Sequence, residues 1–295
     1  MSEQSTDRIA FIGLGTMGSR MSRRLVHAGF EVIGFDPVEA ARADLVAAGG
    51  RAASTAAEAV TGAEYVILML PSSRVVESVL DDAALLDALK PGIAVIDMSS
   101  SEPESTRKLA AALAERKLTL VDAPVSGGVR GAEAGTLTIM AGGPGDAITE
   151  VQPILAPLGT VRHVGGTGAG HAVKAINNLL AATNLLAAAE GVAAGRRFGV
   201  DPSVIIETIN TASGRSAATQ LKFPQNILPE TYDSGFALAL MLKDMRIATD
   251  LARSVGAPAT LGEQAVELWS RAAADLDPAA DQTDIARWVD RPRNP

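Results

Sequence analysis

The sequence predicts an N-terminal α/β domain with a doubly wound, mainly parallel sheet, followed by an all-α C-terminal domain. Helix-length spacers separate short apolar runs in the first half: RIAFIGLG, FEVIGFD, AEYVILML, GIAVIDMSS and LTLVDAPVSGG. This alternation is typical of βαβ units. After TLTIMAGG and TVRHVG, the apolar positions follow a helical period to the end of the chain. We therefore expect one domain over residues 1–165 and a second over residues 166–295.

The helical half is expected to begin with one long helix that joins the two domains. The glycine-rich segment GGTGAG ends at Gly170, and the apolar stretch after it extends to about residue 197. At about 1.5 Å per residue, such a helix spans roughly 40 Å. FGVDP ends it, with Asp201 as the expected N-cap of the next helix and Pro202 at its first position. Further helices are expected at about 202–212, 236–256 and 260–274, and around Trp288.

Composition limits the partners and the chemistry of the chain. It has 295 residues, a net charge of −8 and no cysteine. The acidic balance argues against nucleic acid and anionic membranes as partners. The lack of cysteine excludes thiol nucleophiles, disulfides and cysteine-based zinc sites, and we expect no bound metal. The polar N-terminal segment lacks a signal-peptide pattern and no apolar run reaches about 18 residues, so a cytoplasmic protein is expected.

A glycine motif between the first two apolar runs predicts a Rossmann-like dinucleotide site. The three glycines of GLGTMG stand between a strand and a helix that starts near Met17. Glycines at this spacing permit a tight turn, close approach to a pyrophosphate and helix–strand packing, and the helix N-terminus supplies an anion site. The loop residues expected to contact the cofactor are Gly13, Leu14, Gly15, Thr16, Met17 and Gly18.

An acidic residue closes the second strand of this unit. Asp36 lies 18 residues after Gly18. A carboxylate there can accept hydrogen bonds from both ribose hydroxyls and repels a 2′-phosphate, so NAD is favoured over NADP. Two other interpretations of the motif stay open at this point. They are a structural glycine-rich turn, and a methyltransferase-type nucleotide site in which a similar acid binds a ribose.

A second glycine segment is expected at the rim of the sheet. Ser126, Gly127 and Gly128 follow an apolar strand. Successive backbone N–H groups beside a serine hydroxyl form a concave site suited to a carboxylate. A tight structural turn explains the same residues equally well.

The start of the long helix carries a polar face. Lys174 and Asn178 are four residues apart and share that face, with His171 one turn earlier and Leu185 in the apolar part beyond. A lysine at an apolar junction beside a cofactor can have its pKa lowered enough to exchange protons. Asn178 could fix a substrate group beside it. A solvated helix start accounts for the same pattern.

Six motifs occur in order along nearly the whole chain: GLGTMG at 13–18, MLPS at 69–72, IDMSS at 96–100, DAPVSGG at 122–128, GAGHAVKAINN at 168–178 and LMLKDMRIATD at 240–250. In these motifs the chain resembles the β-hydroxyacid dehydrogenase family, the group of 3-hydroxyisobutyrate dehydrogenase, tartronate semialdehyde reductase and, more distantly, 6-phosphogluconate dehydrogenase. The resemblance implies NAD-dependent interconversion of a small 3-hydroxy acid and its semialdehyde, in a cleft between the two domains.

The resemblance also implies a role for each matching residue. Lys174 would be the general acid/base. The substrate would be held by Ser126, Gly127, Gly128 and Asn178. Beyond the glycine loop, the cofactor would be lined by Leu70, Pro71, Ser100 and Lys243. Asp250 falls where the family often has an acid one helical face along from Lys243.

Two departures from the family pattern bear on substrate and cofactor. Ala217 follows SGRS, where many members have an aromatic residue that walls the pocket, so a larger or differently shaped substrate is possible. The segment FDP at 35–37 differs from the Asn-Arg pair of NADP-preferring members, which again favours NAD. Arg130, just past the second glycine segment, and Ala217 are the first candidates for residues that select the substrate.

The retained lysine and asparagine bear on the alternatives. An imine reductase-like NADPH enzyme of the same architecture typically replaces the lysine, and a non-catalytic dinucleotide-binding regulator would lose both residues. A methyltransferase would leave Lys174 and the second domain without a role. We expect the substrate to be a small carboxylate or another acidic hydroxy or aldehyde compound. The long helix and the alanine-rich second domain predict a homodimer or homotetramer.

Overall fold

The chain folds into two compact units. The structure is a computed structural model that describes residues 7–291. By internal contacts the chain divides into Met1–Lys174 and Ala175–Pro295. This division lies inside the long helix α9 (Ala169–Phe198), C-terminal to the boundary expected at residues 165/166. The first turn of α9 is hydrogen-bonded to Asp122 of the first unit, so that turn belongs with the sheet.

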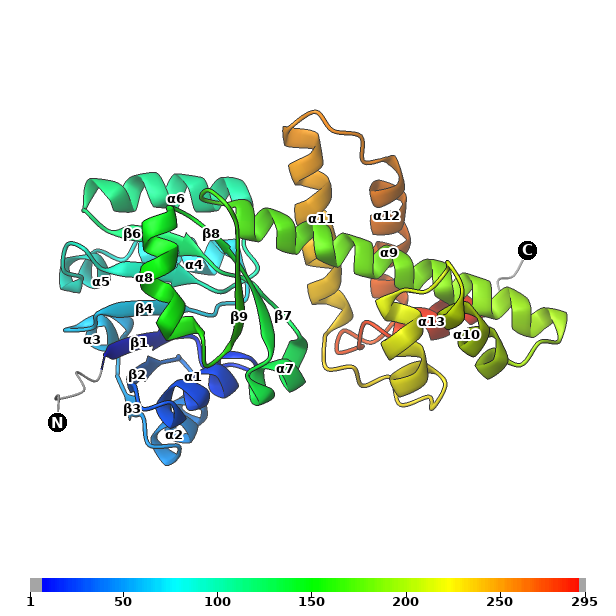
Figure 1. Ribbon diagram of the computed structural model, residues 1–295, viewed down its shortest axis with the longest axis horizontal. Helices are drawn as coiled ribbons and strands as arrows, with labels where there is room; N and C mark the ends of the chain where they lie inside the picture. Colours follow the sequence, from blue (N-terminus) through cyan, green and yellow to red (C-terminus); the bar gives the residue numbers. More distant parts are fainter. Residues whose placement is uncertain (1–6, 292–295) are drawn as a thin grey trace. The chain divides into compact units, whose positions relative to one another are not determined.

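The first unit is built on one sheet with the strand order β3-β2-β1-β4-β5-β6-β8-β7, and with β9 beside β8 (Figure 1). The strands from β3 to β6 run parallel, whereas β8 is antiparallel to β6 and β7. The doubly wound architecture predicted from the sequence is confirmed. The strands are Arg8–Ile12 (β1), Glu31–Phe35 (β2), Arg51–Ala52 (β3), Tyr65–Leu68 (β4), Ala94–Asp97 (β5), Thr119–Asp122 (β6), Val125–Ser126 (β7), Leu137–Gly142 (β8) and Gly159–Gly165 (β9).

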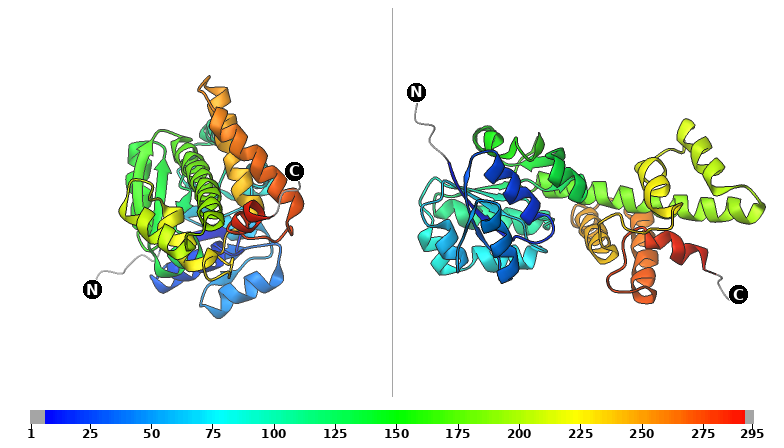
Figure 2. Two further views of the ribbon diagram at one scale, coloured as in Figure 1. Left: turned by 90° about the vertical axis from the view of Figure 1, so that its right-hand side faces the viewer. Right: turned by 90° about the horizontal axis from the view of Figure 1, so that it is seen from below.

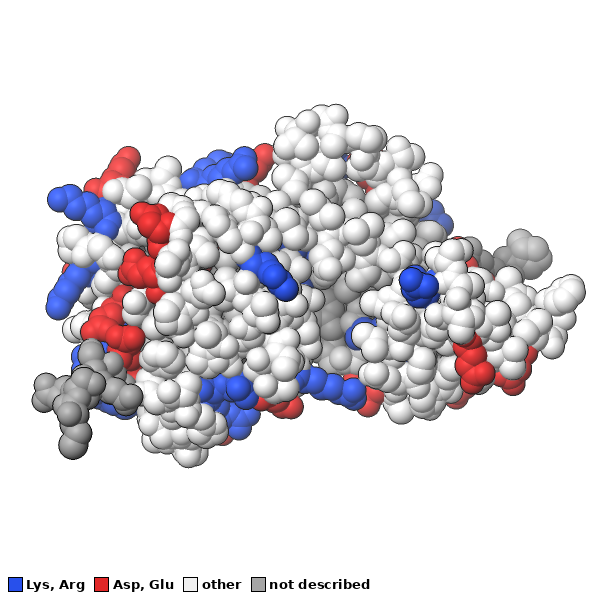
Figure 3. Space-filling view, in the orientation of Figure 1, with Lys and Arg blue, Asp and Glu red and all other residues white. Residues whose placement is uncertain are grey.

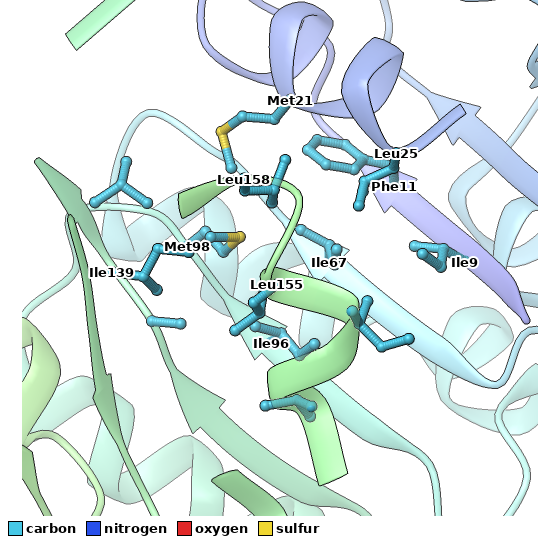
Figure 4. Close-up of a cluster of buried hydrophobic side chains, with 14 of the residues drawn as sticks. Ile9, Phe11, Met21, Leu25, Ile67, Ile96, Met98, Ile139, Leu155 and Leu158 are labelled. Carbon is cyan, nitrogen blue, oxygen red and sulfur yellow. The ribbon is translucent and has the colours of Figure 1, made fainter. Parts of the chain in front are cut away.

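Helices cover both faces of this sheet. Strand residues alternate between its two sides, so the apolar strands present buried side chains on each face. Ile9 and Phe11 of β1 pack with Met21 of α1 and Leu155 of α8 on one face (Figure 4). Their neighbour Ala10 packs on the other face, with residues of α3, α4, α5 and α6. The helices of this unit are Gly18–His27 (α1), Glu39–Ala47 (α2), Ala56–Val60 (α3), Ser73–Leu80 (α4), Ala83–Ala88 (α5), Pro103–Glu115 (α6), Gly128–Ala134 (α7) and Gly145–Leu155 (α8).

The second unit is helical, and α9 runs through it without a break (Figure 2). The later helices are Pro202–Thr211 (α10), the π-helix Ala218–Ile227 (η1), Leu238–Ser254 (α11), Thr260–Asp275 (α12) and Asp284–Asp290 (α13). Their core surrounds the fully buried Trp269. The Asp201 side chain accepts a hydrogen bond from Ser203 N, which confirms the predicted cap of α10. The π-helix η1 was not predicted from the sequence.

Charged side chains are interspersed on the visible face of the molecule. In Figure 3, Lys and Arg side chains stand singly or in small groups among neutral residues, with Asp and Glu side chains between them. Among the helices of residues 7–291, none is both long enough and apolar enough to cross a membrane.

An ion-pair group holds the start of β1 to β2 and β3. Glu31 accepts hydrogen bonds from Arg8 Nε at 3.1 Å and from Arg51 NH1 at 3.0 Å. The hydrogen bond from Arg8 is the largest cause of the lowered pKa of Glu31, partial burial opposes it, and Arg51 adds to it. Because the folded-state pKa is depressed, the stabilisation is present above the ordinary pKa and is lost as pH falls through the lowered value.

Glu31→Gln is therefore expected to lower the free energy of unfolding by about 0.5–1 kcal/mol at pH 7, the usual range for a partly exposed pair. Below the ordinary pKa of 4.5 the difference from wild type should shrink. Urea unfolding at pH 7 and at a pH below 4.5 measures this difference in stability. Glu150→Gln on α8 is the control, because it makes the same charge change at an exposed position. A Glu31→Gln difference that grows on acidification would contradict the assignment.

Candidate active site

The glycine loop between β1 and α1 has the shape that a pyrophosphate site requires. Gly13 has φ of 96°, and a Cβ there would lie 2.3 Å from the carbonyl oxygen of Met69. A Cβ on Gly18 would lie 1.9 Å from the carbonyl oxygen of Gly13. A Cβ on Gly15 would meet no atom within 4 Å, and the residue is exposed. The fold thus requires the outer two glycines, while the middle one lies in space that a dinucleotide can fill.

Asp36 directly follows β2 and is held against this loop. Its Oδ2 accepts a hydrogen bond from Leu14 N at 2.8 Å, and its Oδ1 accepts one from Val38 N at 2.9 Å. Both bonds orient the carboxylate beside the predicted ribose position. Arg42 of α2 donates to the main-chain oxygen of Asp36 at 2.5 Å. This cation lies next to the predicted NAD-selecting acid, a position not predicted from the sequence.

The other predicted cofactor residues of the first unit follow the two neighbouring strands. Leu70 and Pro71 come shortly after β4, and Ser100 comes after β5. Since β1, β4 and β5 are adjacent and parallel, their carboxyl ends meet at one edge of the sheet. Leu70 N donates to Ser99 Oγ at 2.9 Å, which ties the two segments together.

The second glycine segment spans the end of β7 and the start of α7. Gly127 has φ of 130° and Gly128 has φ of 61°, a region that favours glycine. Both are exposed, and a Cβ on Gly128 would meet nothing within 4 Å. The next helix, α7, lies beside α1, because Arg20 Nε pairs with Glu133 Oε1 at 2.9 Å. The structure thus brings this segment close to the helix that follows the glycine loop.

The polar face at the start of α9 is buried rather than solvated. Lys174 is 9% exposed and Asn178 is 5% exposed. Both oxygens of the Asp122 carboxylate cap the helix, accepting from Gly168 N at 2.8 Å and His171 N at 3.0 Å. A Cβ on Gly170 would lie 2.2 Å from the carbonyl oxygen of Met140, so only glycine allows α9 to approach β8 so closely. The solvated helix start considered as an alternative is therefore wrong.

Three polar side chains of the second unit form one group. Asn178 Nδ2 donates to Asp244 Oδ2 at 2.6 Å, and Lys243 Nζ pairs with Asp244 Oδ1 at 2.8 Å. Asp244 is 2% exposed. Asn178 and Lys243 were predicted from the sequence, but the acid that joins them was not. The only signal for Asp244 was its place beside Lys243 in LMLKDMRIATD.

Three further candidate residues were predicted from the sequence. Asp250 is exposed and pairs with Arg253 at 2.7 Å, whereas the acid that pairs with Lys243 is Asp244, so a role for Asp250 stays a prediction. Arg130 is exposed on α7, and Ala217 immediately precedes η1. Among the described residues, no group of three or more His, Asp or Glu side chains could hold a metal ion.

The doubly wound sheet, the glycine loop and the oriented carboxylate after β2 together define a dinucleotide-binding protein. Comparison with known proteins assigns the chain to a narrower class of dinucleotide-binding proteins. The family described as the NAD binding domain of 6-phosphogluconate dehydrogenase matches residues 8–168. The family described as NAD-binding of NADP-dependent 3-hydroxyisobutyrate dehydrogenase matches residues 168–289.

Individual relatives cover nearly the whole chain. A 2-(hydroxymethyl)glutarate dehydrogenase of Eubacterium barkeri is 39% identical over 89% of this chain and 88% of its own. An NAD-dependent L-serine dehydrogenase of Pseudomonas aeruginosa is 40% identical over 89% and 91%, respectively. The solved structure of Mycobacterium tuberculosis 3-hydroxyisobutyrate dehydrogenase with L-serine has a TM-score of 0.90 and 35% identity, and the match covers 96% of this chain and 99% of that one.

The chain therefore belongs to the β-hydroxyacid dehydrogenase family. It is an NAD-dependent hydroxyacid dehydrogenase.

Proposed function

We propose that the enzyme interconverts a small 3-hydroxy acid, similar to 3-hydroxyisobutyrate or L-serine, and its semialdehyde, with Lys174 as general acid/base. The observation that carries this proposal is the burial of Lys174 and Asn178 on one face of α9. A buried lysine beside a fixed amide is suited to proton exchange with a substrate hydroxyl. The relatives that act on serine and 3-hydroxyisobutyrate support the choice of substrate class.

Lys174 moves the proton of the reaction. In oxidation, its neutral Nζ accepts the hydroxyl proton of the substrate while the carbinol carbon gives up a hydride. In reduction, the protonated Nζ donates to the developing alkoxide. NAD, when bound, supplies the hydride acceptor or donor. Atoms and charge balance, because the alcohol loses one proton to Lys174 and one hydride to the cofactor.

Asn178 orients the reacting hydroxyl. Its amide is held at both ends, since Nδ2 donates to Asp244 and Oδ1 accepts from Asn177 Nδ2 at 3.1 Å. An asparagine amide has two N–H donors, so the second N–H can reach the substrate. Lys243, paired with the same Asp244, is assigned to the cofactor.

The substrate carboxylate is held by Ser126, Gly127 and Gly128. Gly128 leaves the backbone open to an anion, because a Cβ there would meet no atom within 4 Å, and the serine hydroxyl supplies a further donor. The cofactor is held by the residues assigned from the sequence: the glycine loop 13–18, Asp36, Leu70, Pro71 and Ser100. We assign NAD binding to residues 1–165 and substrate binding and oligomerisation to residues 166–295.

A panel of small hydroxy acids with NAD+, followed by NADH absorbance, tests the proposal. We expect turnover with 3-hydroxyisobutyrate or L-serine, and loss of most turnover with the methyl ester of the same acid, which lacks the carboxylate. The same panel with NADP+ should be slower. Comparable rates with the ester would contradict the carboxylate site. Turnover confined to imine reduction with NADPH would favour the imine reductase alternative. Cytoplasmic location and a homodimer or homotetramer stay predictions from the sequence.

A further inference from the structure

A buried histidine at the start of α9 is used by no step of the proposed reaction. His171 is 1% exposed. Its Nε2 lies 3.1 Å from the carbonyl oxygen of Ser99. A carbonyl oxygen can only accept a hydrogen bond, so Nε2 carries a proton and donates it to Ser99. The imidazole thus joins α9 to the segment that follows β5.

The other ring nitrogen also has a hydrogen-bond partner. Nδ1 lies 2.8 Å from Thr106 Oγ1 of α6. With the proton on Nε2, Nδ1 is an acceptor for this hydroxyl, whose single proton can otherwise be donated to the Glu102 carbonyl oxygen at 3.1 Å. Asp97 Oδ2 lies 3.7 Å from Nε2, and the Asp97 carboxylate also accepts from Ser99 N at 2.9 Å and from Ser101 Oγ at 2.8 Å. The ring is therefore held on both edges by side chains and backbone of one buried network.

Ser99 connects this network to the predicted cofactor-lining segments. Its carbonyl oxygen accepts from His171, and its hydroxyl accepts from Leu70 N at 2.9 Å. Leu70 and Ser100 are both assigned to the cofactor. His171 N donates to Asp122, which anchors the same turn of α9 to β6. One continuous set of hydrogen bonds therefore runs from Leu70 through Ser99 to the helix turn directly before Lys174.

We propose that His171 is a positioning residue, whose Nε2–Ser99 hydrogen bond sets the position of Lys174 relative to the cofactor-lining segments at Leu70 and Ser100. This proposal rests on the proposed role of Lys174. Lys174 is three residues after His171 on the same helix, so a shift or rotation of that turn moves the lysine directly. Reactions of this kind depend steeply on alignment, since misplacement by about 1 Å can cost on the order of 100-fold in rate.

Two amide substitutions of His171 test the contacts of Nε2 and Nδ1 separately. Glutamine places its Nε2 near the position of the histidine Nε2, so His171→Gln keeps a donor for the Ser99 carbonyl. Asparagine reaches only as far as Nδ1, so His171→Asn keeps a partner for Thr106 and loses the bond to Ser99. Thr106→Val is the matched control, because it removes the Nδ1 partner and leaves the Nε2 bond in place.

The experiment measures kcat, the KM of the hydroxy acid and the primary deuterium isotope effect, with substrate deuterated at the carbinol carbon. We expect His171→Asn to lower kcat about tenfold, with KM changed less than about threefold, since alignment and not binding is lost. The isotope effect on kcat should rise, because hydride transfer becomes slower. His171→Gln and Thr106→Val should retain kcat within about threefold. Should His171→Asn fail to fold, His171→Met fills the site without a donor and is expected to show the same loss.

A purely structural role predicts a different outcome. Wild-type kcat and isotope effect in His171→Asn or His171→Met, with only the melting temperature lowered, would overturn the proposal. An equal loss of kcat in Thr106→Val would also overturn it, because the effect would then come from packing around the ring. Absence of turnover by the wild-type enzyme with every hydroxy acid would overturn the proposed function itself. An active wild type beside an unimpaired His171→Asn variant overturns the positioning role alone.

Discussion

Lys174→Ala is expected to lower kcat by about 10³- to 10⁴-fold, the upper range for loss of a general acid/base. NADH affinity should change less than about twofold, because the predicted cofactor contacts lie on other segments and a loss confined to the transition state leaves binding intact. Stopped-flow or steady-state rates at saturating substrate measure the first quantity, and NADH fluorescence titration measures the second.

Lys174→Arg and Lys90→Ala sharpen this test. Arginine keeps the positive charge but does not release its proton in proteins, so Lys174→Arg should be as slow as the alanine variant if proton transfer is the role of the lysine. Lys90 is exposed and lies outside every predicted site segment, so Lys90→Ala should be fully active. Substantial turnover by Lys174→Ala would refute the assignment of the general acid/base.

Asp36→Ala is expected to reduce the preference for NAD over NADP, expressed as the ratio of kcat/KM values, by about two orders of magnitude. Juxtaposed like charges cost several kcal/mol, and about 1.4 kcal/mol corresponds to a factor of ten. Removal of the carboxylate therefore removes the main repulsion of a 2′-phosphate. It also leaves Arg42, which donates to the main-chain oxygen of residue 36, as a cation close to that phosphate.

Asp36→Asn separates the effect of the carboxylate charge on cofactor preference from the effect of its hydrogen bonds to the glycine loop. The amide retains an oxygen that can accept from Leu14 N or Val38 N, so the glycine loop keeps more of its support than in Asp36→Ala. Both variants should gain NADP activity, and Asp36→Ala should lose more NAD activity. Asp44→Asn on α2 is exposed, changes the net charge equally and should leave the ratio unchanged. A wild-type preference for NADP would contradict the cofactor assignment.

The parts of the fold predicted from sequence are those with long, periodic apolar patterns. The buried strands around Phe11, Ile67 and Ile96 are continuous apolar runs, and α9 has helical periodicity over its whole length. The two-residue strands Arg51–Ala52 and Val125–Ser126 are too short to give a pattern. The π-helix η1 contains Pro224 and many polar residues, and its wider turn departs from the 3.6-residue period that the prediction uses.

Site residues that stand in a local motif were predicted, whereas contacts between residues far apart in the sequence were missed. Gly13, Asp36 and Lys174 each stand in a motif whose spacing indicates a role. The contact of His171 with Ser99 joins residues 72 positions apart, and that of Asn178 with Asp244 joins residues 66 apart. No local pattern contains such pairings. Arg42 was missed for a related reason, because its partner is a backbone oxygen, which carries no sequence signal.

The single helix α9 also limits which insertions and deletions the chain can tolerate. Lys174 and Asn178 lie on the same helical stripe as Ala182, Leu185 and Ala189, which are buried in the core of the second unit. At about 100° per residue, one inserted residue after Asn178 would turn that core stripe away from the Lys–Asn pair, whereas seven residues would restore the phase to within about 20°. Length changes in this segment across evolution should therefore be absent or keep the helical phase, as insertions of about 7, 11 or 18 residues do.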